Sequence, residues 1–287
     1  MGEPRTERLQ AKRRCSLMSL DLTSVRAKLA RSAEHAQTVK NEVKSWMDRN
    51  PYSVLQKVNA DSTRYGIILR VNEPPPLYRW SLIIADCIHA LRCCLDHLVY
   101  GIACHDVAPK PPSNESSLQF PITDSRPDFD KAVISRKQLG TISDPVRAAI
   151  EFYQPYNRPH PDLPPLLSIL RSLSNRDKHK LLPLVLHSVV AADVGMDFGF
   201  DVRDRDPRFV ASNGEIEDGA EVCAITFNRP TPNMKFDRTV IHVVIAMRHS
   251  KRDPATPTSY EWTDFLPLLN FLSAEVRQII YEVSAKV

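Results

Sequence analysis

The chain has 287 residues, of which 43% are hydrophobic and 25% charged, so a chain that is disordered throughout is excluded. The formal net charge of +4 permits contact with a polyanion but does not indicate one, because nucleic-acid-binding domains usually concentrate far more positive charge. Twenty-three prolines against eight glycines predict stiff connections rather than flexible linkers.

The N-terminal part divides into a polar stretch and a helix. Residues 1–17 are polar and basic, and we expect them to form a disordered tail. Met18 directly precedes the first patterned segment and competes with Met1 as the true start. Apolar residues then recur at steps of three and four over residues 20–49, which predicts a helix that ends before Asn50-Pro51.

A hairpin and a long helix follow. Residues 52–59 and 64–72 are predicted to be strands joined by a polar turn at 60–63. Prolines at 74–76 separate them from the strongest helical pattern of the chain, at residues 80–102.

The rest of the chain changes character near Pro183. Before it, helices are predicted at 144–152 and 166–180, each following a loop rich in proline or serine. Beyond it, four short, alternating, β-branched segments predict an antiparallel sheet: 184–191, 196–202, 221–227 and 238–247. A last helix is predicted at 260–283.

These elements predict an α+β fold with a helical core, an antiparallel sheet and a C-terminal helix. The expected organisation is the tail at 1–17, a helical core with an inserted hairpin at 18–182, and the sheet with the last helix at 183–287. One continuous domain over the last two parts is the alternative.

The cysteines indicate a reducing compartment. Four of the six fall within eighteen residues, and no C-x-x-C pair occurs, so we expect free thiols. No apolar run is long enough for a transmembrane helix, and the start lacks the apolar centre of a signal peptide. A cytoplasmic protein without membrane contact is therefore predicted.

The helix at 80–102 has one apolar and one unusual polar side. On a wheel of 100° per residue the apolar side consists of Ile84, Cys87, Ile88, Leu91, Cys94, Leu95, Leu98, Val99 and Ile102. The polar side carries Asp86, His89, Cys93, Asp96, His97 and Tyr100, with Arg92 at its edge. It contains neither Lys nor Glu, which dominate ordinary solvated faces, so it indicates either a functional site or a buried polar network.

Arg92 and His97 form an R-x4-H motif on this helix. The motif resembles the HEPN superfamily, whose ribonucleases carry R-x4–6-H on a helix and dimerise. A wider pattern over residues 78–182 resembles a set of uncharacterised bacterial proteins with the motifs LRxxLDHL, FPI, QPY and NxDKH. Here these motifs end at Leu98, Ile122, Tyr156 and His179.

The resemblance implies a metal-independent ribonuclease or RNA-binding protein that acts as a homodimer, with RNA as its partner and no cofactor. In this interpretation His97 moves a proton and Arg92 stabilises the phosphate charge. The two side chains point about 140° apart on one helix. A second helix is then needed to bring an arginine and a histidine together, which is consistent with a site across a two-fold dimer. Cys93 stands where the superfamily usually has a polar residue.

Further residues are expected to support this site: Asp86, His89, Cys93, Asp96, Asn175, Asp177 and His179. Asp177 interrupts the apolar stripe of its helix and therefore needs a partner. Arg92, His97 and backbone amides are the candidates.

Three other interpretations were compared with this one. A zinc site is disfavoured because His89 and His97 lie about 12 Å apart along the helix, so that no metal is expected. Cysteine catalysis requires Cys93 beside His97, but nothing marks an oxyanion hole or a third partner. The main alternative is a non-catalytic binding or scaffold protein in which Asp96, His97, Asp177, His179 and Arg92 belong to a buried network.

Overall fold

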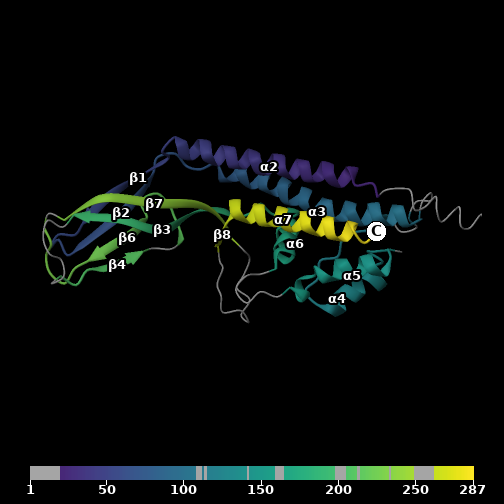
Figure 1. Ribbon diagram of the computed structural model, residues 1–287. Coiled ribbons are helices and arrows are strands. Elements are labelled where there is room, and N and C mark those ends of the chain that lie inside the picture. The colour runs from purple at the N-terminus through teal and green to yellow at the C-terminus, as the bar shows by residue number, and fades with distance from the viewer. Residues whose placement is uncertain are drawn as a thin grey trace, which may run out of the picture. The chain divides into compact units, whose positions relative to one another are not determined.

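The computed structural model describes residues 20–107, 112, 115–140, 142–158, 165–197, 205–211, 214–232, 234–248 and 262–287. The predicted tail at 1–17, and with it the choice between Met1 and Met18, lies outside these residues. The described residues form an α+β protein with antiparallel sheets and a C-terminal helix, as the sequence predicts (Figure 1). No helix among them is long and apolar enough to cross a bilayer.

The α-helices are α2 (Thr23–Asp48), α3 (Leu77–Val107), α4 (Arg126–Asp130), α5 (Asp144–Phe152), α6 (Leu166–Asp177) and α7 (Phe265–Ser284). Three short turns accompany them: the 3-10 helices η1 (Glu115–Ser117) and η3 (Pro155–Asn157), and the π-helical turn η2 (Lys131–Ser135). The strands are β1 (Tyr52–Val58), β2 (Arg64–Val71), β3 (Leu184–Asp197), β4 (Arg208–Ala211), β5 (Gly214–Glu215), β6 (Glu221–Thr226), β7 (Lys235–Arg248) and β8 (Trp262–Asp264).

Beyond residue 183, two predictions differ from the structure, for different reasons. Residues 184–191 and 196–202 were expected as separate strands, but β3 continues through to Asp197. Its register against β7 shifts twice on the way, so Asp193 and Gly195 mark irregularities in one strand rather than a turn. The last helix begins at Phe265 and not at 260, because Trp262–Asp264 pairs with β7 as β8.

The strands form two antiparallel four-stranded sheets, in the orders β1-β2-β6-β4 and β5-β3-β7-β8. β1 and β2 form the predicted hairpin. On its other side β2 pairs with β6, where Tyr65 lies opposite Ile225. Strands from both sides of residue 183 therefore share one sheet, and the domain boundary expected there stays a prediction.

The chain groups into two compact units. The first contains the described residues of Met1–Thr38, Leu82–Leu181 and Leu266–Val287, and the second those of Val39–Ser81 and Leu182–Phe265. Both long helices, α2 and α3, contribute residues to each unit.

In the second unit, aromatic side chains hold the ends of α2 and α3 together. Trp46 and Trp80 are buried edge to face, with ring centroids 5.8 Å apart. The indole of Trp46 donates to the Glu73 carbonyl at 3.0 Å, so its polar atom is satisfied. A second cluster lies under the first sheet and consists of Tyr65, Ile225, Phe227 and Met234.

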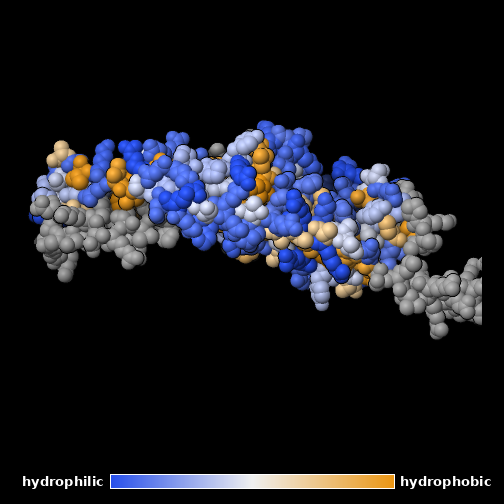
Figure 2. Space-filling view, turned by 90° about the horizontal axis from the view of Figure 1, so that it is seen from above, coloured by the Kyte–Doolittle hydropathy of each residue, from blue (hydrophilic) through white to orange (hydrophobic). Residues whose placement is uncertain are grey.

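In the first unit, the predicted apolar side of α3 forms the core. Every residue assigned to that side of the wheel, from Ile84 to Ile102, is at most 1% exposed. Small polar groups allow α2 to approach closely: Ser32 Oγ lies 3.2 Å from Cys87 Sγ, and the Cys94 thiol donates to the Val25 carbonyl at 3.8 Å. Seen from above, where α2 faces the viewer, the surface is mostly hydrophilic with separate hydrophobic spots (Figure 2).

Candidate functional site

The arginine of the R-x4-H motif binds its own chain. Arg92 is 18% exposed and forms an ion pair of 3.0 Å with Asp96, one helical turn further along α3. Its Nη2 also donates to the Phe120 carbonyl at 2.6 Å, while Asp96 Oδ1 accepts the Phe120 N–H at 2.9 Å. Both backbone polar groups of Phe120 are thus bound by one pair of side chains, which we call the Arg92–Asp96 clamp.

Burial acts on both charges of the clamp. It lowers the pKa of Arg92 below its ordinary value, an effect that Asp96 opposes. It raises the pKa of Asp96, and Arg92 and the Phe120 N–H oppose that shift. Each charge therefore depends on the other, as expected for a partly buried ion pair.

The QPY motif holds the next residues of the same segment. Gln154 is fully buried, and its amide Nε2 donates to the carbonyls of Pro121 at 2.9 Å and Ile150 at 3.1 Å. Its Oε1 accepts from Thr123 N at 2.9 Å and from the Thr123 hydroxyl at 3.2 Å. All the usual hydrogen-bonding positions of this amide are used.

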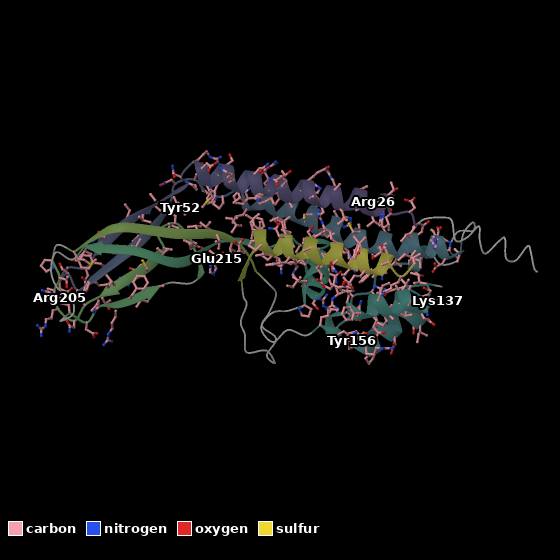
Figure 3. All side chains as sticks on the ribbon, in the orientation of Figure 1. Arg26, Tyr52, Lys137, Tyr156, Arg205 and Glu215 are labelled. Atoms are coloured by element: carbon pink, nitrogen blue, oxygen red, sulfur yellow. The ribbon has the colours of Figure 1, made fainter. Side chains whose placement is uncertain are left out.

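Two further side chains, those of Tyr156 and Arg171, form contacts close to Gln154 and the FPI motif. Tyr156, labelled in Figure 3, donates to Glu151 Oε1 at 3.0 Å. From α6, Arg171 donates to the Ile122 carbonyl at 3.1 Å and forms an ion pair with Asp124.

These contacts join residues of three of the motifs to one buried segment. Residues 118–123 have no regular secondary structure, yet Phe120, Pro121 and Ile122 are buried. Their backbone groups have neither a helix nor a sheet to satisfy them, so side chains must do so. Arg92, Asp96, Gln154 and Arg171 supply these bonds from three different parts of the chain.

His97 differs from Arg92. It is half-buried on α3, and in the described part of the chain its imidazole has no hydrogen-bond partner. Burial raises the pKa of Asp96, and His97 and Lys178 are among the groups that oppose this rise, so both lie near that carboxylate. Among the residues that the structure describes, His97 is therefore a polar group near Asp96 whose ring nitrogens form no hydrogen bond.

The NxDKH motif does not join the R-x4-H motif as expected. Asp177 is half-buried at the end of α6, whereas Asn175 and His179 are exposed. Among the described contacts none joins Asp177 to Arg92 or His97, and Arg92 takes Asp96 instead. Two of the three candidate partners for Asp177 are thus not found in that role.

The remaining predicted residues lie on the outer side of α3. Asp86 and His89 are exposed and Cys93 is half-buried. Cys93 Sγ lies 3.4 Å from His89 Nε2, so the approach to His97 that cysteine catalysis would require is not observed. His89 and His97 are both four residues from Cys93, a spacing at which helical side chains can meet.

The thiols of Cys93, Cys94 and Cys223 are not activated. Burial raises the pKa of Cys93 above its ordinary value, whereas a nucleophilic cysteine needs a lowered pKa. Burial also raises the pKa of Cys94 to about 12 and that of Cys223 to about 11.

The rates at which these thiols are alkylated should reflect their raised pKa values. With iodoacetamide at pH 8, we expect Cys94 and Cys223 to react at least about tenfold more slowly than a free thiol, because the thiolate is the reactive form. Cys93 should also react more slowly than free cysteine, and faster as the pH rises. Peptide mass spectrometry of the folded protein measures the rates, with the denatured protein as control. A Cys93 that outpaces free cysteine at pH 7 would contradict the shift.

Two further findings bear on the site. In the region that the structure covers, no group of three or more His, Cys, Asp or Glu side chains is placed to hold a metal ion. No protein-family model, curated protein or solved structure matches this chain.

The sequence interpretation missed the roles of Gln154 and Arg171. Gln154 appeared there only within the QPY motif, and Arg171 did not appear. The available signal was a lone polar residue beside a proline at the end of a helix, which is too common to identify a contact.

Proposed function

We propose that this chain is a non-catalytic binding or scaffold protein, in which the Arg92–Asp96 clamp stabilises the fold rather than contacting a substrate. The observation that supports this is the engagement of both Phe120 backbone groups by the pair. Both contacts are made by Nη2, so a substrate phosphate that bound this nitrogen would displace them. That would leave a buried carbonyl without a donor and Asp96 without its counter-charge, at a cost of several kcal/mol.

A second candidate function is the metal-independent ribonuclease that the R-x4-H motif suggests, acting as a homodimer. The half-buried imidazole of His97, without a hydrogen-bond partner among the described residues, favours it. In this alternative His97 transfers the proton of the RNA 2′-hydroxyl, and the nearby Lys178 contributes positive charge. Arg92 would then act through the position of α3 and not by contact with phosphate.

RNA cleavage separates the two candidates. Purified wild-type protein, Arg92→Ala and His97→Ala are incubated with labelled RNA in EDTA, and sedimentation reports the oligomeric state. We expect no cleavage above background from any of the three, and a lower melting temperature for Arg92→Ala alone. Cleavage by the wild type that His97→Ala abolishes, with unchanged circular dichroism and melting, would reject the binding protein in favour of the ribonuclease.

A further inference from the structure

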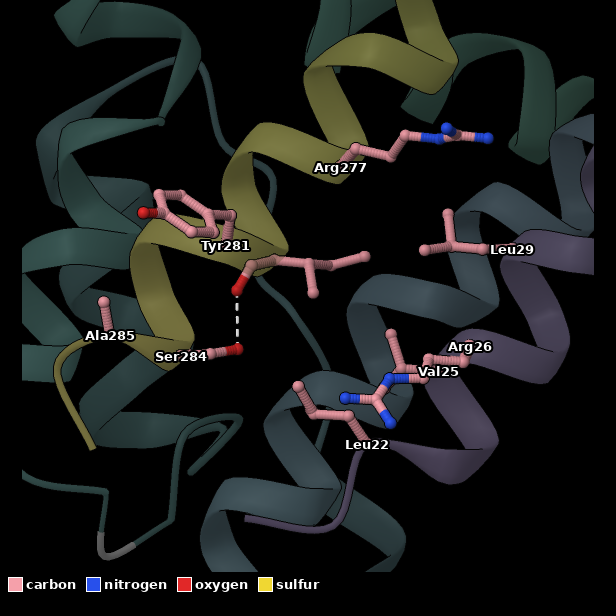
Figure 4. Close-up of a pocket in the computed structure, with 9 residues that line it drawn as sticks. Leu22, Val25, Arg26, Leu29, Arg277, Tyr281, Ser284 and Ala285 are labelled. Carbon is pink, nitrogen blue, oxygen red and sulfur yellow. Dashed lines mark hydrogen bonds between the residues drawn. The ribbon is translucent and has the colours of Figure 1, made fainter. Parts of the chain in front are cut away.

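An apolar groove lies between the start of α2 and the end of α7, both within the first compact unit (Figure 4). Its volume is about 470 Å³. Leu22, which directly precedes α2, lines it together with Val25 and Leu29 of α2, and Ile280 and Tyr281 line it from α7. Leu22 and Leu29 are only half-buried, so the two helices leave apolar surface uncovered here.

The edge of the groove carries an exposed aromatic ring. Tyr281 is 73% exposed although it lies on the same helix as the fully buried Val283 and Ile279. A tyrosine beside half-buried leucines combines apolar area with a polar tip, a composition enriched at protein interfaces.

Two arginines set the charge of the groove. Arg26 lies on α2 and Arg277 on α7, and both are exposed among the lining residues. Neither forms an ion pair with a residue that the structure describes. The Asp21 carboxylate, which accepts the Thr23 N–H at 2.8 Å, lies near Arg26 and offsets part of its charge, so the two arginines still leave the groove with a positive edge. The complementary occupant is therefore apolar toward the groove and anionic at its edges.

We infer that this groove binds an amphipathic helix of a partner protein, with apolar side chains in the groove and carboxylates facing Arg26 and Arg277. A helix fits because the groove is bounded by two helices, and a third packs its ridge of side chains into such a groove. The inference names the class of partner for the proposed binding function and so rests on that proposal.

A designed peptide tests it. The probe is a fluorescent helical peptide of about 18 residues, with leucines spaced as on one helical face and glutamates elsewhere. A second peptide replaces every glutamate by lysine. Anisotropy is measured with the wild type, with Arg26→Glu/Arg277→Glu, and with the control Lys40→Glu/Lys131→Glu. The control changes two exposed lysines outside the groove and alters the net charge equally.

We expect the acidic peptide to bind the wild type and the lysine peptide not to bind. The arginine double variant should weaken binding at least about tenfold, which equals about 1.4 kcal/mol, and the control by less than about twofold. Tyr281→Ala should weaken it as well through lost apolar contact.

Three outcomes would overturn the inference: no binding at about 100 μM peptide, equal weakening in both double variants, or binding of sodium dodecanoate instead of the peptide. The last would assign the groove to a lipid chain. The RNA assay on the same preparation keeps the two proposals apart. Cleavage there rejects the binding function, whereas failed peptide binding without cleavage rejects only the groove's occupant.

Discussion

Replacing Arg92 by alanine is expected to lower the free energy of unfolding by about 3 kcal/mol. The change removes the hydrogen-bond donor to the Phe120 carbonyl and the positive charge beside Asp96. The carbonyl and the carboxylate then stay within the protein without this partner. Urea denaturation of the purified variant measures the loss. Arg126→Ala is the matched control, because Arg126 forms ion pairs at the surface with its side chain 60% exposed, and such pairs contribute about 0–1 kcal/mol.

The loss of stability caused by Arg92→Ala should become larger as the pH rises. Burial already raises the pKa of Asp96, and removing Arg92 takes away the main opposing charge. A carboxyl with a raised folded pKa supports folding below its unfolded pKa and loses that contribution as the pH rises through the folded value. The difference between wild type and Arg92→Ala should therefore be largest near pH 7 and shrink toward pH 4.

A double-mutant cycle tests whether the two residues act together. Arg92→Ala, Asp96→Ala and the double variant should show a coupling of about 1–2 kcal/mol, since the residues touch each other and share Phe120. A loss below about 1 kcal/mol for Arg92→Ala, or no coupling, would show that the clamp is not a main support of the fold. The proposed function would then lose its basis.

Gln154→Ala should destabilise the protein by about 4 kcal/mol, because four hydrogen bonds are lost in a fully buried place and a cavity is left. Thermal and urea unfolding report the change. Gln278→Ala serves as the control, since Gln278 lies on the exposed side of α7 and its loss should alter stability by about 0.5 kcal/mol at most.

Gln154→Glu separates hydrogen bonding from volume, because the side chain keeps its shape. One carboxylate oxygen would face the carbonyls of Pro121 and Ile150, where the amide now donates. The variant should be unstable at pH 7 and recover as the pH falls and the carboxyl becomes protonated. If Gln154→Glu were as stable as the wild type at pH 7, the described bonding of the amide would be wrong.

Much of the fold follows from local patterns. The wheel of residues 80–102 separated the buried side of α3 from its polar side, and the ranges predicted for β1, β2 and α5 agree with the structure within one residue. α3 nevertheless begins at Leu77 and extends to Val107, beyond the predicted range. The periodic segment is only the part of a helix that packs regularly, so pattern alone misses its ends.

The candidate site was less predictable. The sequence singled out α3 and Arg92, and it grouped the LRxxLDHL, FPI and QPY motifs. It did not indicate that the LRxxLDHL motif binds the FPI motif, since Asp96 and Phe120 are 24 positions apart and Phe120 lies outside any regular element. Pairing Cys93 with His97 was equally open by spacing, and only the structure shows that the thiol meets His89.

By itself the sequence determined the α+β class, the apolar side of α3 and the chemistry of its polar side, because periodicity and residue type are local properties. Only the tertiary structure decided that Arg92, Asp96 and Gln154 form their hydrogen bonds within the chain itself. Most of their partners are backbone N–H and C=O groups, which nearly every residue carries and which therefore leave no mark in the sequence.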